Sequence, residues 1–306
     1  MYDCALFDVD GVLVDIRKSY NTAIKKTTEF MLSRLLGRAL RGIVTDEIIL
    51  KFRQSGGFNN DTDTTYAITL ATLSNPPRNL TDGRKFLRTV AENANETGIA
   101  SVEKYLERYD IWKWKSELAY PAPVADSVLA RVFDELFYGP ELFRQQNMLE
   151  PKYWKGRPLI RNDIQAVTAV TMRQLHRTFG GRIAMVTGRS KLAAEVSLKS
   201  LMKYFDLEAC VFLEDEKREY AKPNPYAIRK AMEVMGAKSA VYSGDSAEDF
   251  LMAMRAEKEI GARIAFVGIY GYSPQPAKTL ENFKSLGVHA TAKTVNQLPG
   301  LIKSRL

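Results

Sequence analysis

Short apolar runs alternate with helix-forming segments in this chain of 306 residues, and this pattern constrains its fold more than any other feature of its sequence. The runs are short and bounded by glycine, proline or charged residues, which is typical of buried strands. One run opens the chain and the others lie in its second half: residues 4–7, 182–186, 210–213, 240–243, 263–267 and, more weakly, 288–292. Alternation of this kind predicts an α/β fold, a Rossmann-like three-layer α/β/α core with a mainly parallel sheet. Helices are expected between the runs, the first of them at 163–179.

Residues 16–161 follow another pattern, because apolar side chains recur there at helical spacing and no strand-like run is convincing. We expect helices at about 20–36, 46–54 and 61–73, the third with Asp61 as its N-cap, two or three helices within 81–119, and an amphipathic helix that ends at Gly139-Pro140. These residues therefore predict an all-α domain inserted after the first strand, with residues 1–15 and 162–306 forming the core.

Composition and charge exclude several classes of protein. The net charge of +8 is shared evenly between residues 15–160 and the rest of the chain, and no basic tail or block indicates a nucleic-acid partner. No apolar run approaches the roughly 18 to 20 residues that span a bilayer, and Asp3 and Asp8 stand where a signal peptide carries basic residues. We expect a cytoplasmic protein without a membrane partner, in which Cys4 and Cys210 are reduced and have no chemical role.

Two carboxylates stand at the tip of the first strand. The run 4–7 ends in Asp8, and Asp10 follows just before Gly11. Burying an isolated charge is costly, so acids placed together at the end of a buried strand need a cation or strong hydrogen-bond donors nearby. Mg²⁺ is the candidate cation, because it is a hard ion that prefers oxygen ligands. An ordinary turn after a strand is the structural alternative.

Three further polar motifs lie at the same edge of the predicted sheet. They are Thr187-Gly188, Lys222-Pro223, and Gly244-Asp245 with Asp249 four residues later. Strand ends and helix starts leave backbone N–H groups that can hold an anion. The motifs contain no histidine, so general acid and base work falls to a carboxylate.

Each of these motifs also has a purely structural interpretation. Thr187 could cap the helix that follows it, Lys222 could be an exposed loop lysine, and Asp249 could be an acid on a helix surface. We interpret Arg189 as a solvated arginine at a helix start and place it outside the site.

The four motifs, in this order and at this spacing, resemble the haloacid dehalogenase superfamily of phosphohydrolases. Asp8-Val-Asp-Gly-Val resembles its nucleophile motif, and Thr187, Lys222 and Gly244-Asp-Ser-Ala-Glu-Asp resemble the other three. The opening DGVLVD and the GDSAED form resemble the branch of phosphoglycolate phosphatases and β-phosphoglucomutases, which carry a helical cap of the C1 type. The resemblance implies that residues 16–161 are an enlarged cap domain, longer than the compact caps of those enzymes.

The resemblance also implies how the reaction is performed. Asp8 would be the nucleophile that forms an aspartyl-phosphate, and Asp10 the general acid and base. The implied cofactor is Mg²⁺, held by the Asp8 carboxylate, the Asp10 main-chain carbonyl and Asp245. An aspartate at position 10 indicates phosphate-ester chemistry, because dehalogenases and phosphonate hydrolases of this superfamily have another residue there.

Phosphate binding follows from the same resemblance. Thr187, the Gly188 amide and Lys222 would hold the phosphoryl group, and Asp249 would orient Lys222 or a metal-bound water. The expected function is a Mg²⁺-dependent phosphatase that hydrolyses a small phosphorylated metabolite. A phosphomutase of the β-phosphoglucomutase type is the first alternative. An alternative of another class is a catalytically idle binding or regulatory protein on the same scaffold.

The most unusual stretch of the insertion is Gly56-Gly-Phe-Asn-Asn-Asp61. Its two glycines would let the backbone approach a ligand, and two adjacent amides can bind hydroxyls or a carboxylate. We hypothesise that Asn59 and Asn60 contact the substrate. The alternative is a helix C-cap followed directly by a helix N-cap.

Overall fold

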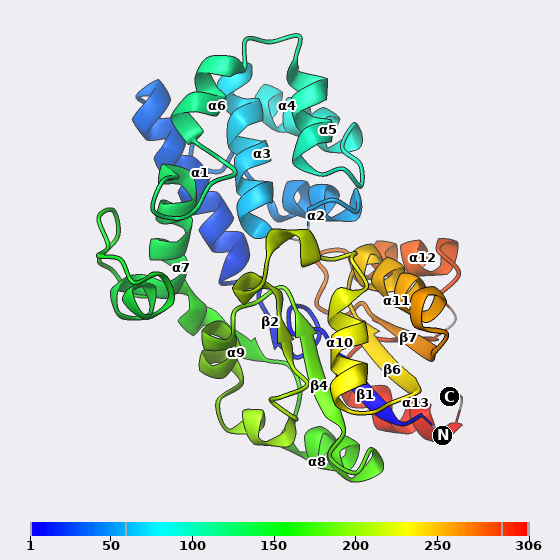
Figure 1. The fold of residues 1–306 in the computed structure, drawn as a ribbon. Helices are drawn as coiled ribbons and strands as arrows, with labels where there is room; N and C mark the ends of the chain where they lie inside the picture. The colour runs from blue at the N-terminus through cyan, green and yellow to red at the C-terminus, as the bar shows by residue number, and fades with distance from the viewer. Residues whose placement is uncertain (1, 59, 289, 305–306) are drawn as a thin grey trace. The chain divides into compact units, whose positions relative to one another are not determined.

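The computed structural model describes residues 2–58, 60–288 and 290–304. The chain forms two compact units, one of residues 1–16 and 163–306 and the other of residues 17–162. The sheet of Figure 1 belongs to the first unit, and the second unit is built from helices throughout its described residues.

The first unit is built on a six-stranded sheet in the order β5-β4-β1-β6-β7-β8, and its described pairings are all parallel. The strands are β1 (Cys4–Phe7), β4 (Ile183–Thr187), β5 (Val211–Phe212), β6 (Ser239–Gly244), β7 (Arg263–Ile269) and β8 (Ala290–Ala292). β1 is buried along its whole length between β4 and β6, as its continuous apolar run predicts. The expected α/β fold with a parallel sheet is therefore confirmed.

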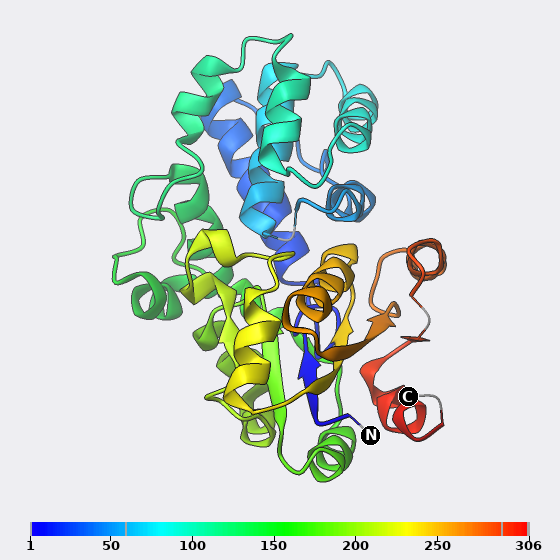
Figure 2. The same cartoon turned by 45° about the vertical axis from the view of Figure 1, so that its right-hand side comes forward.

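Helices connect and cover these strands. They are α8 (Ala169–Thr178), α9 (Lys191–Leu198), α10 (Tyr226–Val234), α11 (Ala247–Ile260), α12 (Pro276–Ser285) and α13 (Leu298–Ser304), with short 3₁₀ turns at Lys199–Tyr204, Leu213–Asp215, Arg218–Tyr220 and Val295–Gln297. α10 and α11 pack against each other on one face of the sheet, as Figure 2 shows, and α8 packs against α13. The apolar stripes of these helices complete the core around the strands.

β2 (Val14–Asp15) follows the first strand in the chain and pairs with β3 (Ile164–Gln165) in a small antiparallel ribbon. The expected helix from residue 163 is therefore wrong at its start. Ile164 pairs with Asp15 instead, and α8 begins only at Ala169, where Thr168 caps it by accepting a hydrogen bond from the Thr171 N–H. Pairing with a segment about 150 residues away in the chain outweighs the local helical pattern.

The second unit is a bundle organised around α3 (Asp61–Ser74), which is buried along most of its length. The other helices are α1 (Tyr20–Leu36), α2 (Asp46–Gln54), α4 (Leu80–Glu92), α5 (Ile99–Leu106), α6 (Trp112–Leu118) and α7 (Val128–Asn147), with a 3₁₀ turn at Leu159–Asn162. α3 contacts each of the helices α1, α2, α4, α5, α6 and α7. The helical character expected of this segment is confirmed.

Two expected helix ends in this unit are wrong. The N-cap of α3 is Asn60 rather than Asp61, because the Asn60 side-chain oxygen accepts hydrogen bonds from two backbone N–H groups of the first turn. α7 does not end at Gly139-Pro140. Gly139 leaves helical geometry with a φ of 67°, and the helix restarts at Pro140 and continues to Asn147, since proline is well suited to a first helical position.

Among the described residues, no helix combines the length and apolar character that crossing a membrane requires.

Candidate active site

The carboxyl ends of three adjacent strands bring predicted site residues together. Asp8 follows β1, Thr187 ends β4, and Asp245 follows β6. The chain runs from β1 outward through β4 and β5 and then crosses to β6 on the other side of β1. Such a reversal of strand order is where parallel α/β sheets bind ligands.

Lys222 lies between two buried carboxylates. Its Nζ is 2.8 Å from Asp8 Oδ1 and 2.7 Å from Asp249 Oδ1. Its side chain is 1 % exposed, so the interpretation of Lys222 as an exposed loop residue is wrong. Burial by itself would lower the pKa of Lys222, but the Asp249 and Asp8 carboxylates outweigh burial and raise that pKa. Lys222 therefore keeps its positive charge inside the protein.

Asp249 is a fully satisfied buried acid rather than a helix-surface residue. Besides Lys222, its carboxylate accepts hydrogen bonds from the Tyr242 hydroxyl at 2.5 Å, from the Ser246 hydroxyl at 2.7 Å and from the backbone N–H groups of Asp245 and Ser246. Burial would raise the pKa of Asp249, but Lys222 and these hydrogen bonds lower it. The Ser246-x-x-Asp249 spacing forms a capping box at the start of α11, which explains why the acid turns inward.

The negative charge of Asp8 is balanced by far fewer donors than that of Asp249, although both carboxylates contact Lys222. Among the described residues, Asp8 Oδ1 accepts no hydrogen bond of good geometry, and its compensation is the ion pair with Lys222. Burial raises the pKa of Asp8 to about 7 against the opposing effect of Lys222, and the Asp249 and Asp10 carboxylates add to the rise. Asp8 is therefore the acid with lone pairs left to bind a cation or to attack an electrophile.

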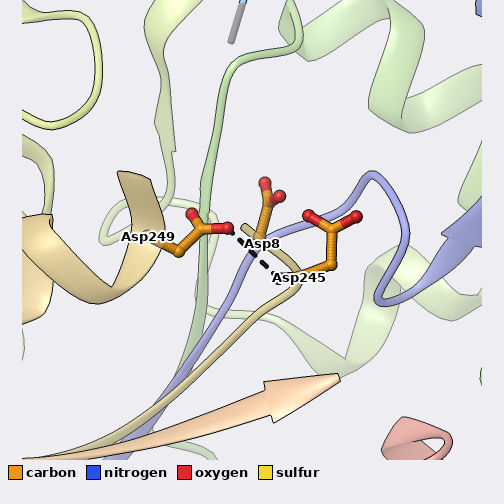
Figure 3. A group of neighbouring side chains, drawn as sticks. All are labelled: Asp8, Asp245 and Asp249. Atoms are coloured by element: carbon orange, nitrogen blue, oxygen red, sulfur yellow. Dashed lines mark hydrogen bonds between the residues drawn. The ribbon is translucent and has the colours of Figure 1, made fainter. Parts of the chain in front are cut away.

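Three carboxylates face one another at this edge of the sheet. Asp8, Asp245 and Asp249 each offer an oxygen within 4.8 Å of the others, and Figure 3 shows the Asp8 carboxylate between the other two. Because Asp249 is already satisfied by its donors, Asp8 and Asp245 are better suited to hold a cation. Carboxylate oxygens of three acids this close together fit a divalent cation that takes oxygen ligands.

Two glycines allow the backbone to approach these acids closely. Gly11 has a φ of +71°, and a Cβ atom there would overlap the Asp245 carboxylate. A Cβ atom at Gly244 would overlap the Asp249 side chain. Glycine at position 11 therefore lets the Asp8 loop approach Asp245, and glycine at position 244 makes room for the Asp249 side chain.

Thr187 is buried at the end of β4, where its Oγ1 accepts a hydrogen bond from the Arg189 N–H at 3.2 Å. The interpretation of Thr187 as the cap of α9 is wrong, because Ser190 caps that helix by accepting a hydrogen bond from the Ala193 N–H. Gly188 is exposed between the two buried residues Thr187 and Arg189.

The interpretation of Arg189 as a solvated arginine at a helix start is wrong. Its side chain is fully buried and forms ion pairs with Asp10 and, at 2.8 Å, with Asp163. Asp10, whose side chain is 24 % exposed, is thus tied to the loop that follows β4. The sequence contained a signal for this contact, because Arg189 lies two residues beyond Thr187 at the end of the same strand. Acids that gather at such an edge of the sheet need positive charges nearby.

Of the two amides expected to contact substrate, Asn59 lies outside the described residues. Asn60 Oδ1 is 2.8 Å from the Thr62 N–H and 3.3 Å from the Asp63 N–H, so this atom serves the α3 N-terminus. The alternative interpretation of this position as a helix N-cap is therefore correct for Asn60, and a contact with substrate stays a prediction.

Known proteins resemble this chain in sequence and in fold. A phosphonoacetaldehyde hydrolase of Lysinibacillus sphaericus is 28 % identical over 190 residues, which cover 57 % of this chain and 70 % of that protein. The phosphatase Tt82 of Thermococcus thioreducens has a TM-score of 0.58 at 22 % identity, over 92 % of this chain and 99 % of that one. A hydrolase of Pseudomonas syringae has a TM-score of 0.51 at 16 % identity, over 99 % of each chain. These two structures share the fold.

The comparison with protein families covers most of the chain. The model of the haloacid dehalogenase-like hydrolases matches residues 2–257, a range that includes the strand ends carrying Asp8, Thr187 and Asp245. The family predicted from the sequence motifs is confirmed: this chain belongs to the haloacid dehalogenase-like hydrolases.

Proposed function

We propose that this hydrolase is a Mg²⁺-dependent phosphatase that cleaves the phosphate monoester of a small metabolite. The observation that carries the proposal is the contrast between Asp8 and Asp249. Both acids contact the Lys222 ammonium, but only Asp249 is saturated by further donors. A buried carboxylate with unused lone pairs beside a fixed cation is suited to nucleophilic attack on an anionic substrate.

In the first half of the reaction Asp8 attacks phosphorus. A bond forms between a carboxylate oxygen and phosphorus while the bond from phosphorus to the ester oxygen breaks, which leaves an aspartyl-phosphate. The Asp10 carboxyl group donates its proton to the departing oxygen, so the leaving group is a neutral alcohol. Thr187, the Gly188 amide and Lys222 bind the phosphoryl oxygens.

In the second half water attacks the aspartyl-phosphate. The Asp10 carboxylate accepts a proton from that water as the new oxygen–phosphorus bond forms. The bond between Asp8 and phosphorus breaks, which releases inorganic phosphate and restores the Asp8 carboxylate. Asp10 ends the cycle protonated, ready for the next ester.

The cation is proposed to be held by the Asp8 carboxylate, the Asp10 main-chain carbonyl and Asp245. When bound, it supplies positive charge that offsets the repulsion between the Asp8 carboxylate and the phosphate. Asp249 has a separate task in this proposal, because its contact with Lys222 orients the ammonium group.

The helical unit is proposed to act as the cap domain, residues 16–161, which recognises the substrate. Asn59 and Asn60 are proposed to contact the substrate. The test is the specificity of the double variant Asn59→Ala/Asn60→Ala across a panel of phosphate esters. A profile equal to that of the wild type would contradict the proposed contact.

A second candidate function is cleavage of a carbon–phosphorus bond, which the relative from Lysinibacillus sphaericus suggests by its name. Asp10 favours an ester as substrate, because an alcohol leaving group needs a proton. Phosphonoacetaldehyde is therefore included among the substrates. Phosphate release from phosphonoacetaldehyde but from no phosphate ester would support cleavage of the carbon–phosphorus bond.

The central experiment measures phosphate release from a panel of phosphorylated metabolites with Mg²⁺ and with EDTA. We expect release that depends on Mg²⁺ and is abolished in Asp8→Asn, while circular dichroism shows that this variant is folded. Wild-type turnover by Asp8→Asn would contradict the mechanism. Isomer formation without phosphate release would indicate a phosphomutase, and inactivity of the wild type on all substrates would favour a binding or regulatory protein.

A further inference from the structure

Arg189 is a fully buried positive charge whose side chain contacts polar side chains of separate segments of the first unit, among them Asp10, Asp163 and Ser197. Its Nη1 donates hydrogen bonds to Asp163 Oδ2 at 2.8 Å and to Ser197 Oγ at 2.7 Å. Its Nε pairs with Asp10 Oδ1. Asp10 belongs to the loop after β1, Asp163 precedes β3, and Ser197 lies on α9.

The guanidinium group is held in place even without Asp10. Ser197 Oγ donates to Asp163 Oδ2 at 2.6 Å, so Arg189, Asp163 and Ser197 form a closed triangle of contacts. The Asp163 side chain is 3 % exposed. A buried ion pair with several hydrogen bonds keeps one arrangement, because any other would leave a charge unpaired inside the protein.

Asp10 is the partner of Arg189 that is accessible from outside. Its side chain is 24 % exposed, whereas those of Arg189 and Asp163 are 0 % and 3 % exposed. A partly exposed aspartate next to Gly11 can adopt several rotamers. The ion pair with a fixed guanidinium selects one of them.

We propose that Arg189 is a positioning residue that holds the Asp10 carboxyl group in the orientation needed for proton transfer. This inference rests on the proposed function, in which Asp10 gives a proton to the leaving oxygen and later takes one from water. A proton donor must lie within hydrogen-bond reach of its acceptor, and a small misplacement can reduce a rate by about 100-fold.

The test measures how the first half of the reaction depends on the leaving group, as the rate of alcohol release in a single turnover, because the later attack of water on the aspartyl-phosphate is the same for every ester. An alkyl phosphate needs the proton from Asp10, whereas p-nitrophenyl phosphate releases a stable anion without it. We expect Arg189→Met to reduce the single-turnover rate of alcohol release from an alkyl ester by about 10- to 100-fold and that of p-nitrophenol release from the aryl ester by less than about threefold. Asp10→Asn should give the same pattern, and Arg189→Lys should recover part of the loss.

A double-mutant cycle separates positioning from a general structural effect. If Arg189 acts through Asp10, adding Arg189→Met to Asp10→Asn should cause little further loss of the single-turnover rate with the alkyl ester. Because Arg189→Met leaves Asp163 without this ion pair, Arg189→Met/Asp163→Asn removes both buried charges and serves if the single variant folds poorly. Arg229→Met is the control, since Arg229 pairs with Glu259 at 3.3 Å with both side chains well exposed.

The following results would overturn the proposal. Equal losses on both esters, or additive losses in the cycle, would show that Arg189 has only a structural role. If Asp10→Asn loses more rate on the alkyl ester than on the aryl ester but Arg189→Met does not, the positioning role of Arg189 is wrong while the proposed function stands. If the wild type releases no phosphate from any ester, the proposed function and the positioning role fail together.

Discussion

Lys222 Nζ lies 2.7 Å from Asp249 Oδ1, and each of the two side chains is only 1 % exposed. The same ammonium group is 2.8 Å from Asp8 Oδ1, so one buried cation serves two buried acids. Breaking such a pair from one side is costly, because the charges left behind have neither water nor a counterion.

Replacing Lys222 should therefore destabilise the protein as well as inactivate it. We expect Lys222→Ala to lower the free energy of unfolding by about 3 to 5 kcal/mol and to abolish phosphate release. Urea unfolding followed by circular dichroism measures the first effect. The control is Lys230→Ala, because the Lys230–Glu216 pair is 40 % and 26 % exposed and should contribute less than about 1 kcal/mol. Equal stability of the two variants would contradict the importance of the buried pair.

Gly11→Ala should damage the proposed cation site specifically. A Cβ atom at Gly11 would overlap the Asp245 carboxylate, so we expect loss of Mg²⁺-dependent activity and a smaller rise in Tm on adding Mg²⁺. Gly261→Ala is the matched control. Gly261 has a similar φ of +62° with nothing within 4 Å of an added Cβ, so that variant should lose about 1 to 2 kcal/mol of stability and keep its activity. If both variants retain the Mg²⁺ response, the close approach is not needed for metal binding.

Glu135 should be essential to the stability of the helical unit. Its fully buried carboxylate accepts hydrogen bonds from the backbone N–H groups of residues 152–154 and from Arg131 Nε. Glu135→Gln places an amide donor among these donors, and we expect a loss of about 3 kcal/mol in thermal or urea unfolding. Glu150→Gln, which alters a 78 % exposed partner of Arg144, should lose less than about 1 kcal/mol.

The two thiols should be inert in the native protein. Cys4 and Cys210 are free and buried, and burial raises the pKa of each to about 12. A raised pKa means less thiolate, so at pH 8 about one thiol in ten thousand is ionised, compared with about one in ten at the ordinary value of 9. Thiol titration at pH 8 should find no reactive cysteine until the protein is denatured, when both react. Rapid reaction of either thiol in the native state would contradict this.

The sequence was sufficient to predict the parallel sheet and the acids at its edge. Apolar runs such as 4–7 and 240–243 are strands in the structure because buried parallel strands need continuous apolar residues. Asp8 and Asp245 follow two of those strands directly, so their proximity depended only on the strands being neighbours. Helix α1 ends before Gly37, which adopts the left-handed conformation that the sequence predicted there.

Contacts between distant segments could not be predicted in this way. Residues 164–165 pair with β2 although their local pattern is helical, and Gly139-Pro140 interrupts a helix without ending it. Arg189 resembles any solvated arginine at a helix start until Asp10 and Asp163 are placed beside it.

The sequence by itself thus determined the family, the sheet and the candidate nucleophile, because these depend on local patterns and short motifs. The tertiary structure decided how each buried charge is compensated. Lys222 is shared by Asp8 and Asp249, and Arg189 is held by Asp163 while it pairs with Asp10. Such pairings arise from segments more than 20 residues apart, and the cost of burying a charge specifies only that partners exist, not which ones they are.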